Sequence, residues 1–252
     1  MNLDRYLGRI GILEMPDASP ASLAQLQTAH LTNIPYETLD ITRGVPFTLD
    51  LPSVYEKIVE RGRGGYCFEL NGLFSWMLSE IGFTVTEHFA RFLRDAAPGI
   101  PMRRHRVLRV TASDGCDYLA DVGVGGVCPL VPLPIDLDTP FTEQNGTWRM
   151  VSDPFYGTVV QERKNGEWRP YYAFTDEAAA EIDFLTTDYW CQSAPESPFR
   201  KNPIVSIQTA TGRKTIRDGE FRIFDGDTVS VTPIENGTHE RQILEEIFNI
   251  RL

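Results

Sequence analysis

The sequence predicts an α+β protein whose helices come first, followed by a mostly antiparallel sheet and a small mixed end. Two observations predict this class. The apolar period changes from helical to strand-like near residue 84. Beyond that point, short apolar or alternating segments are separated by Gly-containing turns, as in antiparallel sheets. At 252 residues the chain is long enough for up to three domains and for a large core.

The helical first third contains three segments with apolar residues at helical spacing. The clearest is 67–81, where they recur at i, i+3, i+4 and i+7. Gly82 follows where a left-handed helix cap is expected. Two shorter helices are predicted at 21–32 and 53–61.

The middle of the chain is predicted to be a sheet. Its expected strands are 84–94, 106–112, 117–124, 147–152, 157–163 and 167–174. The turn Ser113-Asp114-Gly115 predicts a hairpin between the second and third of these. The proline-rich segment 129–140 is expected to be an ordered loop. The end is predicted as a helix over 176–190, short strands within 204–233 and a closing helix at 239–248.

The overall charge argues against two classes of partner. Lys plus Arg is 24 and Asp plus Glu is 35, which gives a net charge of −11. An acidic chain has no general attraction for nucleic acid or anionic lipid. No run of about 18 apolar residues is present, so we also expect no membrane span.

The cysteines predict free thiols and no metal site. They are widely spaced, without a CxxC pair or zinc-ligand spacing: Cys67, Cys116, Cys128 and Cys191. The first residues lack the features of a signal peptide. We therefore expect a cytoplasmic protein in a reducing compartment.

The segment Arg61–Asn71 carries the most specific chemical signal. Gly64 and Gly65 allow a tight turn directly before the predicted helix that begins at Cys67. A thiol at a helix N-terminus meets unpaired N–H groups and the positive end of the dipole, which both favour a reactive thiolate. The alternative is a structural cysteine on an apolar helix face.

A nucleophilic thiol needs an imidazole partner. Of the four histidines, His105 is best placed, because it opens a predicted strand after a loop; the others are His30, His88 and His239. Asp121 ends the next strand and could orient the ring across the hairpin, giving a Cys–His–Asp set of nucleophile, base and orienting group. The alternative for Asp121 is a carboxylate that caps the following turn.

Two further features lie near these residues. The glycines that follow Asp121 allow a ligand to approach the backbone closely: Gly123, Gly125 and Gly126.

Between Arg91 and Arg109, six arginines and one acid, Asp95, give a local charge of +5. This stretch is either a phosphate-attracting rim beside His105 or a solvated strand face paired with acids elsewhere.

These motifs together resemble the arylamine N-acetyltransferase family. The resemblance is carried by RGGYCFELNGLF at 63–74, IPYETLDI at 34–41, His105 before an apolar strand, and LADVGVGG at 119–126. The segment 188–200 is similar to a third region of the family. The likeness implies a helical bundle over 1–83, a β-barrel-like domain over 84–187, a short α/β lid over 188–252, and a papain-like catalytic core.

The resemblance also implies a reaction. Acetyl would pass from acetyl-CoA to Cys67 and then to an arylamine, arylhydroxylamine or hydrazine, with no metal or prosthetic group. It implies acceptor contacts by Phe68 and Tyr36, and a CoA pyrophosphate facing the glycines after Asp121.

It further implies an Arg63–Glu37 ion pair that supports the cysteine loop. The chain departs from the family at Tyr36, where Phe is usual, and at Val124, where an aromatic residue is usual. Two alternatives remain open, namely a cysteine hydrolase, transglutaminase-like or biosynthetic amide-forming enzyme with the same triad, and a non-catalytic binding module.

Overall fold

The first third of the chain is a group of helices around one long central helix. The computed structural model describes residues 1–94, 96 and 98–252. The helices are α1 (Leu3–Arg9), α2 (Pro20–Asn33), α3 (Leu39–Arg43), α4 (Leu51–Tyr55), a π-helical turn (Glu56–Glu60) and α5 (Cys67–Ile81). Helix α5 has the predicted bounds and ends at Gly82 in the left-handed conformation. Helices α1 and α3 were not predicted, because both are short and supported by packing rather than by a long apolar period.

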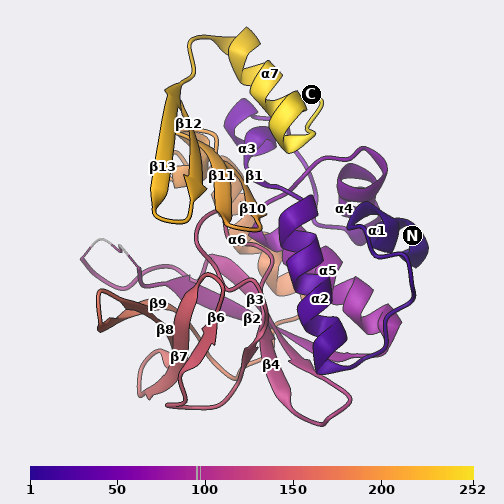
Figure 1. Ribbon diagram of the computed structural model, residues 1–252, viewed down its shortest axis with the longest axis vertical. Coiled ribbons are helices and arrows are strands. Elements are labelled where there is room, and N and C mark those ends of the chain that lie inside the picture. The colour runs from indigo at the N-terminus through magenta and orange to yellow at the C-terminus, as the bar shows by residue number, and fades with distance from the viewer. Residues whose placement is uncertain (95, 97) are drawn as a thin grey trace.

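The middle of the chain forms an eight-stranded antiparallel sheet that curls into a barrel-like shape (Figure 1). Its strands are β2 (Thr84–Phe92), β3 (His105–Thr111), β4 (Asp117–Ala120), β5 (Leu133–Pro134), β6 (Phe141–Glu143), β7 (Gly146–Asp153), β8 (Gly157–Lys164) and β9 (Glu167–Phe174). Their spatial order is β5-β4-β3-β2-β9-β8-β7-β6. The predicted hairpin is confirmed, since β3 and β4 pair with Thr111 opposite Asp117. The proline-rich loop differs from the prediction in contributing the short edge strand β5 and a bridge between Leu137 and Met150.

The end of the chain adds a second sheet that includes a piece of the beginning. Strand β1 (Tyr36–Glu37) pairs with β10 (Val205–Thr209), followed by β11 (Gly212–Arg217), β12 (Glu220–Asp225) and β13 (Thr228–Pro233). The closing helix α7 (Gly237–Phe248) packs on this sheet, with Leu244 and Phe248 against Val205 and Ile216. Tyr36 of β1 forms a bridge with Gly65, which lies two residues before Cys67. This contact connects the second sheet to the N-terminus of α5.

One boundary differs from the sequence prediction. Helix α6 spans Glu181–Ser193 instead of 176–190, because the Asp183 side chain accepts the Ala180 N–H and starts the helix there. This helix crosses the predicted boundary between residues 187 and 188. The division into three domains stays a prediction, whereas the α+β class is confirmed.

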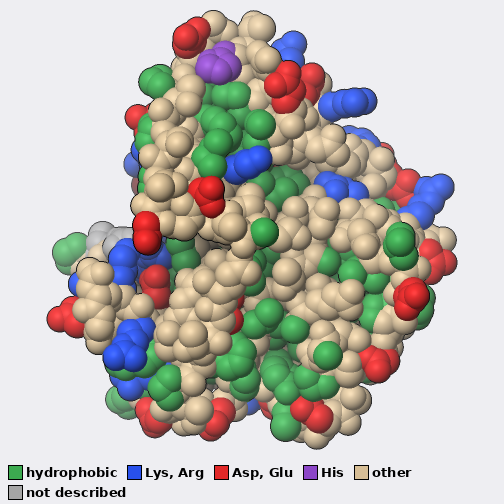
Figure 2. All heavy atoms as spheres, in the orientation of Figure 1, with side chains coloured by type: hydrophobic (Ala, Val, Ile, Leu, Met, Phe, Trp, Pro, Cys, Tyr) green, Lys and Arg blue, Asp and Glu red, His purple; other side chains and the backbone are tan. Residues whose placement is uncertain are grey.

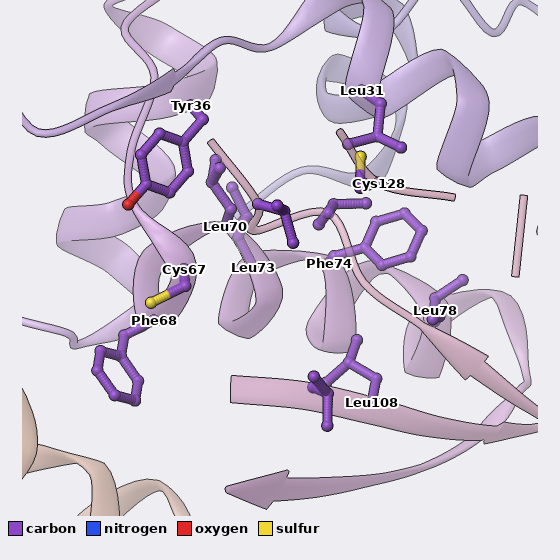
Figure 3. Packing of buried hydrophobic residues seen from close by; sticks show 14 of the residues in the cluster. Leu31, Tyr36, Cys67, Phe68, Leu70, Leu73, Phe74, Leu78, Leu108 and Cys128 are labelled. Atoms are coloured by element: carbon purple, nitrogen blue, oxygen red, sulfur yellow. The ribbon is translucent and has the colours of Figure 1, made fainter. Parts of the chain in front are cut away.

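A single large core places α5 between the other helices and the barrel-like sheet. Figure 3 shows Leu73, Phe74 and Leu78 of α5 between Leu31 of α2 and Leu108 of β3. Over the described part of the chain, no helix is long and apolar enough to span a membrane.

Candidate active site

Cys67 lies at the first position of α5, where the chain turns sharply into the helix. Its side chain is buried, and its Sγ lies 3.8 Å from the main-chain oxygen of Arg104. Gly64 is required in this turn, because a Cβ there would lie 2.1 Å from the Pro35 oxygen. The Gly-Gly turn before the cysteine therefore has the close-approach role that the sequence indicates.

A network of buried ion pairs supports this turn from the helical side. Arg63 Nε lies 2.8 Å from Glu37 Oε1, as the family resemblance implies. Arg63 also contacts Asp40 at 2.9 Å. Lys57 then connects Asp40, at 2.7 Å, to Glu69, at 2.8 Å. The network thus alternates in sign around the turn and leaves each of the five charged groups paired.

Glu69 links this network to the nucleophile's helix. Its second carboxylate oxygen accepts the Tyr66 N–H at 3.0 Å, which caps the first turn of α5. Sequence reasoning treated Glu69 only as a polar neighbour and missed Lys57 and Asp40. The spacing of Tyr66 and Glu69 was the available signal, since a glutamate three residues after a helix start is typical of a cap.

His105 and Asp121 meet across the β3–β4 hairpin. His105 Nε2 lies 2.7 Å from Asp121 Oδ2. The imidazole is fully buried between aromatic rings, with centroid distances of 4.7 Å to Phe92 and 5.7 Å to Tyr172. Its other nitrogen, Nδ1, is buried and has no hydrogen-bond partner within the described residues. One ring nitrogen is therefore held by a carboxylate while the other is available to exchange a proton.

Asn71 connects the cysteine helix to the Asp121 loop, and sequence reasoning did not assign it a role. It lies one turn after Cys67 on α5 and donates to Asp121 Oδ1 at 2.9 Å. Its own oxygen accepts the Val122 N–H at 2.9 Å. Since Asn71 touches both segments, it fixes the carboxylate relative to the helix that carries the thiol.

The three glycines after Asp121 have different surroundings. A Cβ on Gly123 would lie 2.7 Å from Cys67 Cα, so this glycine packs directly against the nucleophile. A Cβ on Gly125 would lie 2.6 Å from the Tyr36 ring. At Gly126, no atom of the described residues lies within 4 Å of that position. Only Gly126 therefore offers open backbone, whereas Gly123 and Gly125 allow close internal packing.

Burial raises the pKa of the Cys67 thiol well above its usual value. The nearby Cys191 and Asp121 add to this effect, and the Arg104 guanidinium opposes it. Burial is the larger influence because it removes the water that would solvate a thiolate. A thiolate in this buried site therefore needs a nearby group that stabilises it.

A cavity of about 420 Å³ lies between the two sheets. Its lining includes Tyr36, Val124, Gly125 and Gly126, beside five arginines: Arg94, Arg104, Arg213, Arg217 and Arg222. Figure 2 shows Lys and Arg side chains at the left edge, close to where the two sheets meet, and others along the upper and right edges. A locally positive cavity exists inside an acidic chain, as expected for binding a small anion.

The predicted arginine-rich stretch supplies only part of this positive charge. Of its six arginines, Arg94 and Arg104 line the cavity. The remaining cavity arginines come from β11 and β12, and the sequence did not identify them. Asp95, the one acid of that stretch, lies outside the described residues.

The other arginines of the stretch have partners elsewhere. Arg106 pairs with Glu87 and donates to the Phe68 carbonyl at 3.1 Å. Arg109 lies 3.1 Å from Asp117. Arg109 therefore fits the alternative of a solvated strand face paired with acids, whereas Arg106 is paired with an acid but buried.

Phe68 and the remaining histidines lie away from the cavity. Phe68 is 1% exposed and packs against Tyr66, Phe89 and Phe184, so it backs the nucleophile without lining the cavity. His30 is buried against Tyr6, and His88 is held by main-chain oxygens of the segment after β9. The described residues contain no group of His, Cys, Asp and Glu side chains that could hold a metal ion.

Comparison with known proteins gives consistent results. An N-acetyltransferase family model matches residues 21–252. The arylamine N-acetyltransferase of Mycolicibacterium smegmatis is 34% identical over 99% of this chain and 90% of its own length. The solved structure of the Mycobacterium tuberculosis arylamine N-acetyltransferase superposes with a TM-score of 0.93 at 30% identity, covering 99% of this chain and 94% of that one. A Mycobacterium marinum arylamine N-acetyltransferase solved in complex with CoA gives a TM-score of 0.91 at 29% identity, covering 99% and 93%.

Proposed function

This chain belongs to the arylamine N-acetyltransferase family, and from that premise we propose that it carries acetyl from acetyl-CoA to an amine on Cys67. The acceptors would be arylamines, arylhydroxylamines or hydrazines. One observation carries the proposal: His105 Nδ1 has no hydrogen-bond partner among the described groups, while Nε2 is held by Asp121. Family membership makes the chain an acyltransferase that uses acetyl-CoA.

In the first half-reaction, the Cys67 proton moves to His105 Nδ1 and the thiolate attacks the acetyl carbonyl. The bond from that carbonyl to the CoA sulfur breaks, and the departing CoA thiolate takes the proton back from His105. Asp121 supports this step because its carboxylate stabilises the imidazolium and fixes the ring orientation. The arrangement corresponds to a papain-like Cys–His–Asp core.

In the second half-reaction, the amine nitrogen attacks the acetyl-Cys67 carbonyl and forms the amide. The amine loses a proton to His105, which returns it to the departing Cys67 thiolate. The resting thiol is thereby restored, so one acetyl is transferred in each cycle.

The cavity supplies a site for each substrate. Arg213, Arg217 and Arg222 lie on the second sheet and suit the phosphates of CoA, together with the open backbone at Gly126. Gly123 and Gly125 shape the loop that approaches the pyrophosphate. Tyr36 lies on the cavity wall where the acceptor ring would enter.

The proposal is tested by intact mass spectrometry after mixing the protein with acetyl-CoA. We expect one acetyl on the wild type and none on Cys67→Ala, while Cys128→Ala, which changes another buried cysteine, keeps the adduct. Adding an arylamine should remove the acetyl and yield the amide.

Absence of the adduct in folded wild type would refute the transferase mechanism. A cysteine hydrolase would instead cleave amides without CoA, which is checked by mixing the protein with an amide substrate in the absence of acetyl-CoA. The cytoplasmic location expected from the sequence stays a prediction.

A further inference from the structure

Helix α6 carries an apolar stripe on its outer side that the rest of the described chain leaves exposed. Ile182 is 68% exposed, Leu185 is 43% exposed and Tyr189 is 73% exposed. Their spacing of three and seven residues places them on one side of the helix, and the exposed Thr186 and Ser193 complete that side without adding a charge. Large apolar side chains in a row on a solvated helix mark a surface for another molecule.

The inner side of α6 is well packed, so the stripe does not result from a loosely held helix. Phe184 and Cys191 are completely buried, and the Phe184 ring centroid lies 5.5 Å from that of Phe68. Asp188 accepts a hydrogen bond from the Tyr66 hydroxyl. Among the described residues that line the cavity, none belongs to α6. The stripe is therefore separate from the active site and lies on the opposite side of a firmly held helix.

The two ends of the stripe carry opposite charges. The first turn of α6 and the residues just before it contain four acids and no base: Asp176, Glu177, Glu181 and Asp183. The segment 194–202, which follows the helix, contains Arg200 and Lys201 against one acid, Glu196. The helix thus presents an uncharged centre between an acidic and a basic end.

Charges at both ends are available to a partner. Arg200 Nη1 donates to the main-chain oxygen of Ser193 at 2.6 Å, which holds this positive charge at the C-terminal end of α6. Glu181, Arg200 and Lys201 are exposed, and within the described chain no ion pair involves any of them. These side chains therefore keep their charge for a contact outside the chain.

A second copy of this chain fits the pattern of the stripe. A two-fold axis near Leu185 that pairs two antiparallel α6 helices brings Ile182 of each copy to Tyr189 of the other. The same axis brings Arg200 of each copy to Glu181 of the other, so the charge contact is made twice. An apolar centre between complementary charges is typical of a specific interface. An anionic membrane does not fit, because four acids lie at one end of the stripe.

We propose that this protein forms a symmetric dimer through the outer side of α6, with the two helices antiparallel. Helix α6 has 13 residues and is therefore about 20 Å long, which limits the buried area to that of a transient interface. The dimer is expected to dissociate on dilution and to weaken at high salt. The inference goes beyond the proposed function and does not depend on it.

Sedimentation velocity of the full chain over a wide range of concentration measures this dimer. We expect Tyr189→Glu and Ile182→Glu each to raise the dissociation constant by about tenfold or more, because each places a charge twice in the apolar centre. Leu13→Glu, which changes an exposed leucine between α1 and α2, is the control and should keep the wild-type dissociation constant. Far-UV circular dichroism checks that each variant is folded.

Charge reversal tests the orientation of the two helices. Glu181→Lys and Arg200→Glu should each raise the dissociation constant, because each sets like charges opposite one another at both ends. Combined in one chain, the two changes restore the direct pair with its signs exchanged and should recover part of the affinity. If the losses in the double variant simply add, the two side chains do not meet and the antiparallel arrangement is wrong.

Two further outcomes would overturn the inference. A wild type that stays monomeric at every concentration would assign the stripe to a partner other than this chain. A wild-type dimer that both Tyr189→Glu and Ile182→Glu leave unchanged would use another surface.

Discussion

The cationic side chains on the two sides of Cys67 differ in whether they are paired with carboxylates. On the helical side, Lys57 and Arg63 are buried or half-buried and each contacts two carboxylates. On the cavity side, Arg104 and Arg213 have no carboxylate partner within the described chain and lie over the aromatic rings of Phe199 and Phe224. The first arrangement holds the turn that presents the thiol, and the second leaves cations available to a substrate.

This difference separates two kinds of cation: supporting charges, which are paired within the fold, and binding charges, which are left unpaired at the cavity. A buried charge is costly unless it is paired, so a paired cation serves the fold. A cation left unpaired at a cavity wall is available to pair with an anionic ligand. Sequence position does not make this distinction, since Arg104 and Arg106 are two residues apart but belong to different classes.

The largest effect is expected from breaking the paired side. Lys57→Met would leave the Asp40 and Glu69 carboxylates without their shared cation in a buried site. We expect the free energy of unfolding to fall by about 4 kcal/mol, measured by urea denaturation. Lys57→Arg should lose much less, and Lys57→Met combined with Glu69→Gln should recover part of the loss. A loss below about 1 kcal/mol in Lys57→Met would show that the network does not support the turn.

The glycine loop offers a matched pair of substitutions with the next largest effect. Gly123→Ala places a methyl group 2.7 Å from Cys67 Cα and 2.6 Å from Asn71 Nδ2, so we expect about 3 kcal/mol of destabilisation and loss of acetyl-enzyme formation. Gly126→Ala adds a methyl group that meets no described residue within 4 Å, so this variant should keep wild-type stability. Thermal unfolding of both variants makes the comparison, and equal stability would contradict the packing role of Gly123.

The sequence predicted the local parts of this site well. Helix α5 follows from its apolar period, and the β3–β4 hairpin follows from the Ser113-Asp114-Gly115 turn. Because His105 and Asp121 lie at matching ends of that hairpin, their contact could also be predicted. These features depend on residues close together in the chain.

The parts that were missed depend on contacts between distant segments. Asn71 reaches the Asp121 loop, and Lys57 joins Asp40 to Glu69, only after the helices have packed. Arg213 enters the cavity because β11 belongs to a sheet that begins with β1. Neither charge counting nor periodicity contains this information, so sequence reasoning identified only the basic stretch between Arg91 and Arg109.

His30 differs from both kinds of arginine and lysine, because its buried side chain is neutral. Its Nδ1 lies 2.8 Å from the Tyr6 hydroxyl, and burial, with a smaller effect of Arg9, lowers the pKa of His30 to about 3. Because this value is below the unfolded value of about 6.5, the contribution of the neutral ring to stability is present above pH 6.5 and is lost as the pH falls toward 3.

We therefore expect His30 to account for about 2 kcal/mol of the stability lost between pH 7 and pH 5. Urea unfolding at both pH values should show a smaller pH effect in His30→Gln than in wild type. His239→Gln, on the surface of α7, is the control and should keep the wild-type difference. An unchanged difference in His30→Gln would mean that the ring is protonated inside the fold.

The smallest effect is expected from the unpaired side. Arg213→Gln removes a cation that no carboxylate in the described chain balances, so the free energy of unfolding should stay close to the wild-type value. The apparent KM for acetyl-CoA should rise by about tenfold, because one charge-assisted phosphate contact is lost. The discharge of acetyl-Cys67 by an uncharged arylamine should not change. Arg163→Gln, which removes an arginine that lies over Trp168 outside the cavity, is the matched control and should alter neither value. A loss of stability in Arg213→Gln without a change in KM would place Arg213 among the supporting charges and remove the distinction between the two sides of the nucleophile.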